Sequence, residues 1–319
     1  MQEIGGYIEF ENFRGKEYHE NAIKLNCGRN CLAYLLQARK ITKIALPYFL
    51  CNSVSDICKK YNVEIRYYHI DSNFMPRDIL LKENEWIYIV NYYGQLTEKN
   101  ICNLYNMYNQ KIIVDYAQAF FQKPIMGIDT LYTCRKFFGV ADGAYLYTNA
   151  EIFDIKKQDK SYDRMRFLMG RYEETASKFY DEYVKNNNYF ENEDIKLMSK
   201  MTENVLRGID YKCIKKHRTD NFITLHKMLK NINKLKLNIP EGAFMYPLYI
   251  DNGDIVRKKL QKLKVYIPTL WPDVFEVCKQ NELEYEMARD ILPLPIDQRY
   301  GLEEMKYIGS LVREYACNS

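Results

Sequence analysis

The sequence predicts an α/β fold, with a large domain built on a mostly parallel sheet and a small α+β domain at the C-terminal end. Short apolar runs alternate with segments of helical periodicity over residues 20–150, the pattern of β–α–β units. Beyond Asn149 the chain becomes charged, and short apolar runs return after Leu237. We expect a large domain over residues 20–235 and a small domain over residues 236–319, together with residues 1–19.

In the first half of the chain, helices and strands are distinguished by the spacing and length of their apolar runs. Leu32, Leu35 and Leu36 recur at helical spacing after the Gly28-Arg29-Asn30 start. The expected strands are shorter, continuous runs of apolar and aromatic residues. Helices are expected at 31–39, 53–61 and 98–108, and strands at 43–49, 63–70, 86–90, 111–114 and 144–148.

The second half of the chain is expected to be mainly helical. Charged segments with apolar periodicity and little Gly or Pro predict long helices over 161–186 and 193–231, the second interrupted near Gly208. Two strands, at 243–250 and 265–268, should flank a helix at 253–262, and a last helix should cover 302–315.

Composition excludes several classes of protein. The 319 residues, 47% of them hydrophobic, can bury a sizeable core, yet no apolar run approaches the length that spans a bilayer. The first residues lack the basic and apolar regions of a signal peptide. Nine cysteines without metal-ligand spacing predict buried thiols in a reducing compartment and no metal site. A net charge of +4, with both signs interspersed, argues against nucleic-acid binding. We expect a cytoplasmic protein without a membrane partner.

Asp115 and Lys136 are the residues that point to a chemistry. Asp115 directly follows the apolar run 111–114, and Lys136 lies about twenty residues later, shortly before the expected strand at 144–148. In parallel sheets ligands bind beyond the carboxyl ends of the strands, where Tyr48 and Tyr93 are also expected. A lysine can form a Schiff base with an aldehyde cofactor. A carboxylate can hold the pyridine nitrogen of pyridoxal phosphate in its protonated form. The pair therefore indicates pyridoxal phosphate chemistry.

A plainer interpretation exists for each of the two residues. An Asp after an apolar strand is commonly a turn residue or a helix cap. A Lys among aromatic residues commonly extends its amine to solvent. The remaining motifs of the chain favour the cofactor interpretation over these alternatives.

Four segments, in the same order and spacing, resemble the DegT/StrS-like sugar aminotransferase family of fold-type I pyridoxal-phosphate enzymes. The resemblance covers most of residues 20–150 and, more weakly, the C-terminal domain. The first two segments are Asn26-Cys27-Gly28-Arg29-Asn30 and Asn91-Tyr92-Tyr93-Gly94-Gln95. The other two are Asp115-Tyr116-Ala117-Gln118 and Lys136 with the Asp142-Gly143-Ala144 turn after it.

The resemblance implies a role for each of these segments. Backbone amides at a helix start bind the cofactor phosphate, which here implicates Gly28, Arg29 and Asn30. Asn91 occupies the family's imidazole or amide position at a strand end. Asp115 would pair with the pyridine nitrogen, Ala117 would pack on the ring face and Gln118 would reach the ring hydroxyl. Lys136 would form the Schiff base.

The chain departs from the family pattern at three places. Leu131 stands five residues before Lys136, where many members have a phosphate-binding Ser, so Thr133 is the candidate for this contact. The position of the aromatic residue that stacks on the cofactor aligns with Cys51, which leaves Tyr48 or Phe49 as the stacking candidates. The chain is also short for the family, and residues 170–210 lack its Asn-Tyr-Arg segment that crosses to the partner subunit.

The resemblance implies an aminotransferase that moves an amino group from an amino acid, glutamate by expectation, to a keto-sugar nucleotide in surface-polysaccharide or amino-sugar biosynthesis. It also implies a homodimer with the active site at the interface. Related sugar dehydratases carry His in place of the Schiff-base lysine, so the retained Lys136 favours transamination. A pyridoxal-phosphate lyase or decarboxylase, or a non-catalytic relative that binds the cofactor, remain as alternatives.

Overall fold

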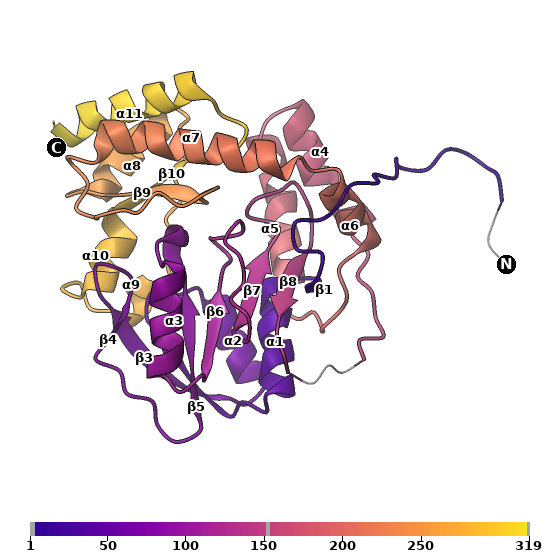
Figure 1. The fold of residues 1–319 in the computed structure, drawn as a ribbon. Helices are drawn as coiled ribbons and strands as arrows, with labels where there is room; N and C mark the ends of the chain where they lie inside the picture. Colours follow the sequence, from indigo (N-terminus) through magenta and orange to yellow (C-terminus); the bar gives the residue numbers. More distant parts are fainter. Residues whose placement is uncertain (1–3, 151–153, 318–319) are drawn as a thin grey trace.

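The computed structural model of the chain describes residues 4–150 and 154–317. Its centre is an eight-stranded sheet in the order β1-β8-β7-β6-β5-β2-β3-β4 (Figure 1). The five strands from β7 to β3 run parallel, and β1, β8 and β4 pair antiparallel at the edges. The strands are β1 (Ile23–Leu25), β2 (Lys43–Pro47), β3 (Glu64–Ile70), β4 (Pro76–Arg77), β5 (Glu85–Val90), β6 (Ile112–Asp115), β7 (Asp129–Thr133) and β8 (Ala144–Tyr147).

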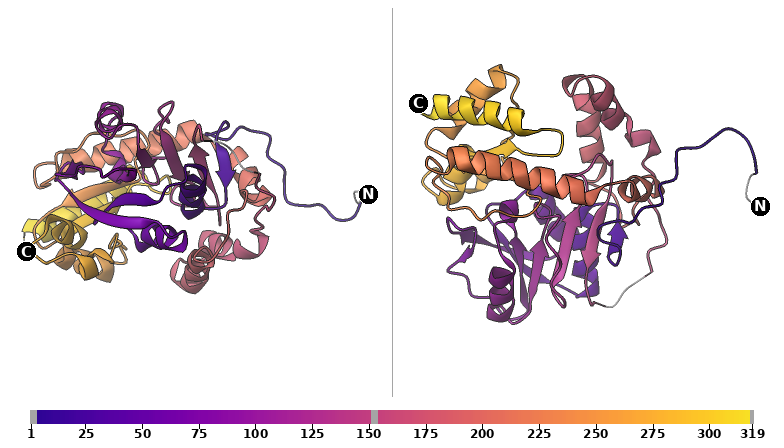
Figure 2. Two further views of the ribbon diagram at one scale, coloured as in Figure 1. Left: turned by 90° about the horizontal axis from the view of Figure 1, so that it is seen from below. Right: turned by 45° about the horizontal axis from the view of Figure 1, so that its top comes forward.

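Helices cover both faces of this sheet (Figure 2). Helices α1 (Gly28–Ala38) and α2 (Asn52–Lys60) pack together on one face, and α3 (Glu98–Met107) lies on the other. Right-handed crossovers explain the arrangement, because the chain moves one way along the sheet from β2 to β3 and the opposite way from β5 to β6. Ile44, Ile87 and Ile113 are completely buried, as expected of parallel strands covered on both faces. The predicted α/β alternation is confirmed.

A second layer lies above the end of the sheet at which the parallel strands finish (Figure 1). Strands β9 (Met245–Tyr249) and β10 (Ile291–Pro295) form an antiparallel pair, and Phe222, Tyr246 and Leu292 belong to their hydrophobic core. Helix α7 crosses this layer with α11 packed beside it, and α8 packs against α11. The helices of this part are α7 (Tyr211–Leu229), α8 (Gly253–Lys262), α9 (Val274–Val277), α10 (Leu283–Asp290) and α11 (Leu302–Cys317).

The single long helix expected over 161–186 is wrong. The segment forms η2 (Tyr162–Arg164), α4 (Arg166–Glu173), η3 (Ser177–Phe179) and α5 (Tyr180–Tyr189). The chain folds back after Glu174 and packs the Phe179 ring on Gly170, where an added Cβ would lie 2.4 Å from a ring carbon. Charged residues with helical periodicity did not reveal this turn, because it depends on a contact between α4 and η3.

Two further boundaries differ from expectation. Residues 193–199 are not helical, and α6 (Lys200–Arg207) starts where the Ser199 hydroxyl accepts a hydrogen bond from the Thr202 amide at 3.1 Å. The predicted break near Gly208 is confirmed by the start of α7. The strand expected at 265–268 is wrong: β9 pairs with β10, which the sequence did not indicate, and Pro268 has no N–H to donate to a ladder. The sequence analysis also missed β1 and β7.

The expected division into two domains stays a prediction, and the packing bears on its boundaries. Phe222, Leu225 and Leu229 of α7 belong to the second core, although the expected boundary falls after them. His19, from the segment assigned to the small domain, packs on Phe120 and Tyr132 beside the main sheet. No helix in residues 4–150 or 154–317 is long and apolar enough to cross a membrane.

Candidate active site

The parallel strands bring several of the predicted site residues to one edge of the sheet. Asp115 is the last residue of β6, and its neighbour β7 ends at Thr133. Asn91 follows β5, and Tyr48 follows β2. Because these strands run parallel, their carboxyl ends share the edge that faces α7 and the β9–β10 pair.

Asp115 is buried and engages both carboxylate oxygens. Its Oδ2 accepts a hydrogen bond from the Tyr88 hydroxyl at 2.9 Å, and its Oδ1 accepts from the Ala117 amide at 2.7 Å. Burial raises the pKa of Asp115, while the positive charge of Lys136 acts in the opposite direction. Asp115 thus caps its turn, as the plainer interpretation expects, and also interacts with the lysine.

Lys136 lies in a tight turn after β7. The amides of Phe137 and Phe138 both donate to the Cys134 carbonyl, at 3.0 and 2.9 Å. The Lys136 side chain is exposed to solvent, yet it is surrounded by protein and its Nζ lies 5.5 Å from the centre of the Phe244 ring. This enclosure lowers the pKa of Lys136, and the charge of Asp115 offsets part of the effect. At a given pH more of this amine is therefore neutral than in an ordinary surface lysine.

The first turn of α1 offers hydrogen-bond donors without a side-chain cap. Its N-cap residue is Cys27, which makes no side-chain cap hydrogen bond, and the residue after it is Gly28. The Nη1 atom of Arg29 is buried and has no hydrogen-bond partner among the described residues. Unpaired amides at the positive end of a helix dipole, next to an unsatisfied guanidinium, suit an anionic group.

Arg135 joins this positively charged region, although it was not among the predicted site residues. Its guanidinium stacks on Phe190, 4.7 Å from the ring centre, and donates to the Asn187 side chain. Burial raises the pKa of Cys27 to about 11, and the charges of Arg29 and Arg135 oppose this rise. Both guanidinium groups therefore lie near the start of α1. The available signal was the position of Arg135 beside Lys136, but its contacts come from α5, far away in the sequence.

Three predicted cofactor contacts have side chains engaged within the protein. The Asn30 amide donates to the Asp194 carbonyl at 2.6 Å. Asn91 is completely buried and both donates to and accepts from the Leu96 backbone. The Gln118 Oε1 accepts from the Tyr93 amide at 2.7 Å. Asn91 therefore shapes the loop after β5, and Gln118 anchors that loop to the turn after β6.

The two stacking candidates and the aligned position Cys51 occupy different surroundings. Tyr48 stacks on Tyr67 with ring centres 5.2 Å apart. Phe49 is almost completely buried and packs on Trp271 at 4.4 Å. Cys51 is exposed at the start of α2, and a thiolate at this position would raise the pKa of Lys136. Of the three, Cys51 is the one whose ionised form would act on the lysine.

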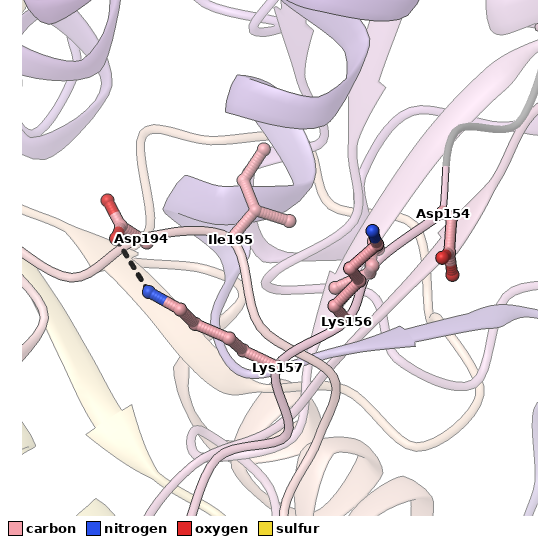
Figure 3. Close-up of a pocket in the computed structure, with 6 residues that line it drawn as sticks. Asp154, Lys156, Lys157, Asp194 and Ile195 are labelled. Carbon is pink, nitrogen blue, oxygen red and sulfur yellow. Dashed lines mark ion pairs between the residues drawn. The ribbon is translucent and has the colours of Figure 1, made fainter.

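A hollow of about 260 Å³ lies elsewhere on the surface (Figure 3). Lys157 and Asp194 on its wall form an exposed ion pair with 3.8 Å between Nζ and Oδ2. Its lining consists of Asp154, Ile155, Lys156, Lys157, Asp194 and Ile195. This lining contains none of the predicted site residues, so the strand edge and not the hollow is the candidate active site.

Comparison with known proteins identifies the fold. No family model matches the sequence, and no curated protein matches it. Solved structures of low sequence identity do match over most of the chain. A DegT DnrJ EryC1 StrS aminotransferase from Brucella abortus has a TM-score of 0.63 at 14% identity, over 92% of this chain and 86% of that one. Helicobacter pylori PseC, an aminotransferase involved in pseudoaminic acid biosynthesis, has a TM-score of 0.64 at 13% identity, over 93% and 87%.

A third match, NtdA from Bacillus subtilis, was solved with bound PMP. It has a TM-score of 0.63 at 13% identity and covers 92% of this chain and 72% of that one. At such identities the likeness shows the fold alone. The expected fold-type I architecture is thereby confirmed.

Proposed function

We propose that the protein is a pyridoxal-phosphate-dependent aminotransferase that moves an amino group from an amino acid, glutamate in our expectation, to a keto-sugar nucleotide. The observation that carries the proposal is the interaction of buried Asp115 with the enclosed amine of Lys136 at the carboxyl edge of a fold-type I sheet. One structural neighbour is described as an aminotransferase involved in pseudoaminic acid biosynthesis and another was solved with PMP, and these descriptions support the proposed reaction and cofactor.

The residues present fit pyridoxal phosphate. The orphaned Nη1 of Arg29, the uncapped start of α1 at Gly28 and the guanidinium of Arg135 would hold its phosphate, with Thr133 at the end of β7 beside them. At the opposite end of the ring Asp115 would bind the pyridine nitrogen. The protonated pyridine nitrogen would then provide the positive charge near the Asp115 carboxylate that the Lys136 amine provides in the cofactor-free protein. By the resemblance Ala117 would contact the ring, while the Gln118 Oε1 already accepts from the Tyr93 amide.

Each polar group then has a definite task. When bound, the cofactor accepts electrons from the carbon that loses a proton. Asp115 would bind the protonated pyridine nitrogen, and its hydrogen bonds from Tyr88 and the Ala117 amide favour its charged form. Lys136 would hold the cofactor, and its Nζ, an amine of lowered pKa, is suited to move a proton. Phe244 shields this Nζ on the side of the β9–β10 pair.

The proposal extends to assembly and location. We expect a homodimer with the active site at the interface, in the cytoplasm and in a pathway to amino sugars or surface polysaccharides. Tyr172 and Tyr180, 93% and 61% exposed, lie on α4 and α5, and α5 also carries Asn187, the partner of Arg135. Exposed aromatic side chains of this kind are enriched in protein interfaces. They are the surface on which a second subunit would rest.

The decisive experiment combines covalent trapping with a substrate panel. Protein loaded with pyridoxal phosphate is reduced with borohydride and mapped, and the pyridoxyl group should be found on Lys136. Keto-sugar nucleotides are then tested with glutamate while 2-oxoglutarate is followed. Carbon dioxide or an elimination product without 2-oxoglutarate would identify a lyase or decarboxylase. Cofactor binding without any turnover would identify a non-catalytic relative, and a label on another lysine would overturn the assignment.

A further inference from the structure

Arg218 on α7 is buried in a way that packing alone does not explain. It is 1% exposed, and the hydrogen-bond acceptors around it in the described residues are neutral oxygens. Its Nε donates to the Gln298 side chain at 2.8 Å, and its Nη1 donates to the Ala243 and Phe244 carbonyls at 3.1 and 3.3 Å. The nearby Asp297 is paired with Arg299. Burial lowers the pKa of Arg218 to about 10, so it remains a cation at neutral pH.

The same guanidinium reaches the turn that carries Lys136. Its Nη2 donates to the Phe137 carbonyl at 3.3 Å, and its carbon lies 4.7 Å from the centre of the Phe137 ring. The Nε2 atom of Gln298 donates to the same carbonyl at 2.9 Å. Two side chains from outside the main sheet therefore bind the carbonyl of the residue that follows Lys136.

Arg218 also binds the residue whose ring covers the lysine. Phe244, whose carbonyl accepts from Arg218, places its ring 5.5 Å from the Lys136 Nζ. A buried cation that lacks a carboxylate partner is costly, and removing any of its acceptors leaves unpaired donors. One guanidinium thus ties the lysine turn and its cover into a single arrangement.

We infer that Arg218 and Gln298 are positioning residues, which hold the Lys136 turn and Phe244 together and thereby set the reactivity of the Lys136 amine. The inference rests on the proposed role of Lys136. If these contacts are lost, the lysine turn separates from its cover and the amine becomes better hydrated. Its pKa then rises toward the ordinary lysine value of 10.5.

The test uses two substitutions that preserve net charge, Arg218→Lys and Gln298→Met, so that a change at Lys136 reports position and not added charge. Cofactor-free protein is exposed to an acylating reagent over a range of pH, and peptide mapping follows the labelling of Lys136 with exposed Lys99 as the internal reference. Arg257→Lys is the matched control, because Arg257 also donates to two backbone carbonyls, those of Arg289 and Ile291, away from the lysine turn.

Both test variants should raise the pH at which Lys136 labelling is half-maximal. Each increase of half a pH unit lowers the fraction of neutral Lys136 amine, at a pH below the midpoint, about threefold. The control and the Lys99 profile should not move. A normal Lys136 profile in either folded variant would overturn the inference. If Arg218→Lys fails to fold, Gln298→Met still decides the question, because it removes a contact to the same carbonyl. Since labelling needs no cofactor, attachment of pyridoxal phosphate to another lysine would reject the proposed function and leave this result standing.

Discussion

The two sides of the candidate site are built from different kinds of residues. On the sheet side, the reactive groups Asp115 and Lys136 are contributed by β6 and the turn after β7. On the α7 and β9 side, the residues that face them are Phe244, which covers the amine, and Arg218, which donates to neutral carbonyls. The sheet side thus supplies charge, and the other side supplies enclosure and position. Substitutions on the two sides should therefore differ in kind as well as in size.

The largest effect is expected for Lys136→Ala. It removes the amine that binds the cofactor and moves the proton, so turnover should fall on the order of 10³-fold or more. The side chain is exposed to solvent, and the free energy of unfolding of the cofactor-free protein should change little. Turnover and urea unfolding are measured on the same preparations, with Lys99→Ala as the control. A large loss of stability would show that Lys136 is needed for the folded structure and would contradict a purely chemical role.

Asp115→Asn should have the next largest effect on turnover. An opposite charge nearby shifts a pKa by roughly one to three units, so loss of the carboxylate should slow turnover by about tenfold to a thousandfold. The amide can still accept from the Ala117 N–H, which preserves the turn. The pKa of Lys136 should fall further, because the charge of Asp115 opposes the lowering of this pKa by burial.

The direction of this shift is the sharpest contrast between the two sides. Acylation profiles should place the Lys136 midpoint below that of the parent protein in Asp115→Asn and above it in Arg218→Lys. Shifts in the same direction in both variants would contradict the division into a sheet side that supplies charge and an opposite side that supplies enclosure. Normal turnover with lowered stability would leave Asp115 as a turn cap only.

Gly242→Ala should destabilise the loop before β9 that carries Phe244, because it strains the backbone there. Gly242 has a φ of +62°, and an added Cβ would lie 2.3 Å from a ring carbon of Phe121. A residue other than glycine in this conformation costs about 1–3 kcal/mol, and the clash with the ring adds to it. The melting temperature should fall, and the Lys136 midpoint should rise because Phe244 is two residues away. Gly301→Ala, where the nearest atom to an added Cβ is 3.6 Å away, is the control.

The smallest effect is expected for an exposed ion pair between α7 and the loop before β9. The Nζ of Lys215 on α7 lies 2.6 Å from Glu241, but Glu241 is mostly exposed. Such surface pairs contribute about 0–1 kcal/mol. A double-mutant cycle with Lys215→Met and Glu241→Gln should therefore give a small coupling and an unchanged labelling midpoint. A coupling well above this range would show that the ion pair, and not Arg218, holds the loop before β9.

The sequence by itself determined the parts of this protein that depend on neighbouring residues. The apolar runs around 44, 87 and 113 specify buried parallel strands, because a strand covered on both faces must be apolar throughout. The order of Asp115, Ala117 and Gln118 at the end of such a strand, with Lys136 after it, was sufficient to propose the chemistry. Gly208 likewise indicated the break between α6 and α7.

Only the tertiary structure decided the contacts that join distant segments. Arg135 meets Asn187, Arg218 meets Phe137 and Gln298, and β9 pairs with β10, each across 40 or more residues of sequence. Periodicity reports which face of a local element is apolar, but it does not report which carbonyl a distant arginine will reach. The identity of the reactive groups was therefore readable along the chain, whereas their enclosure and positioning depend on long-range packing.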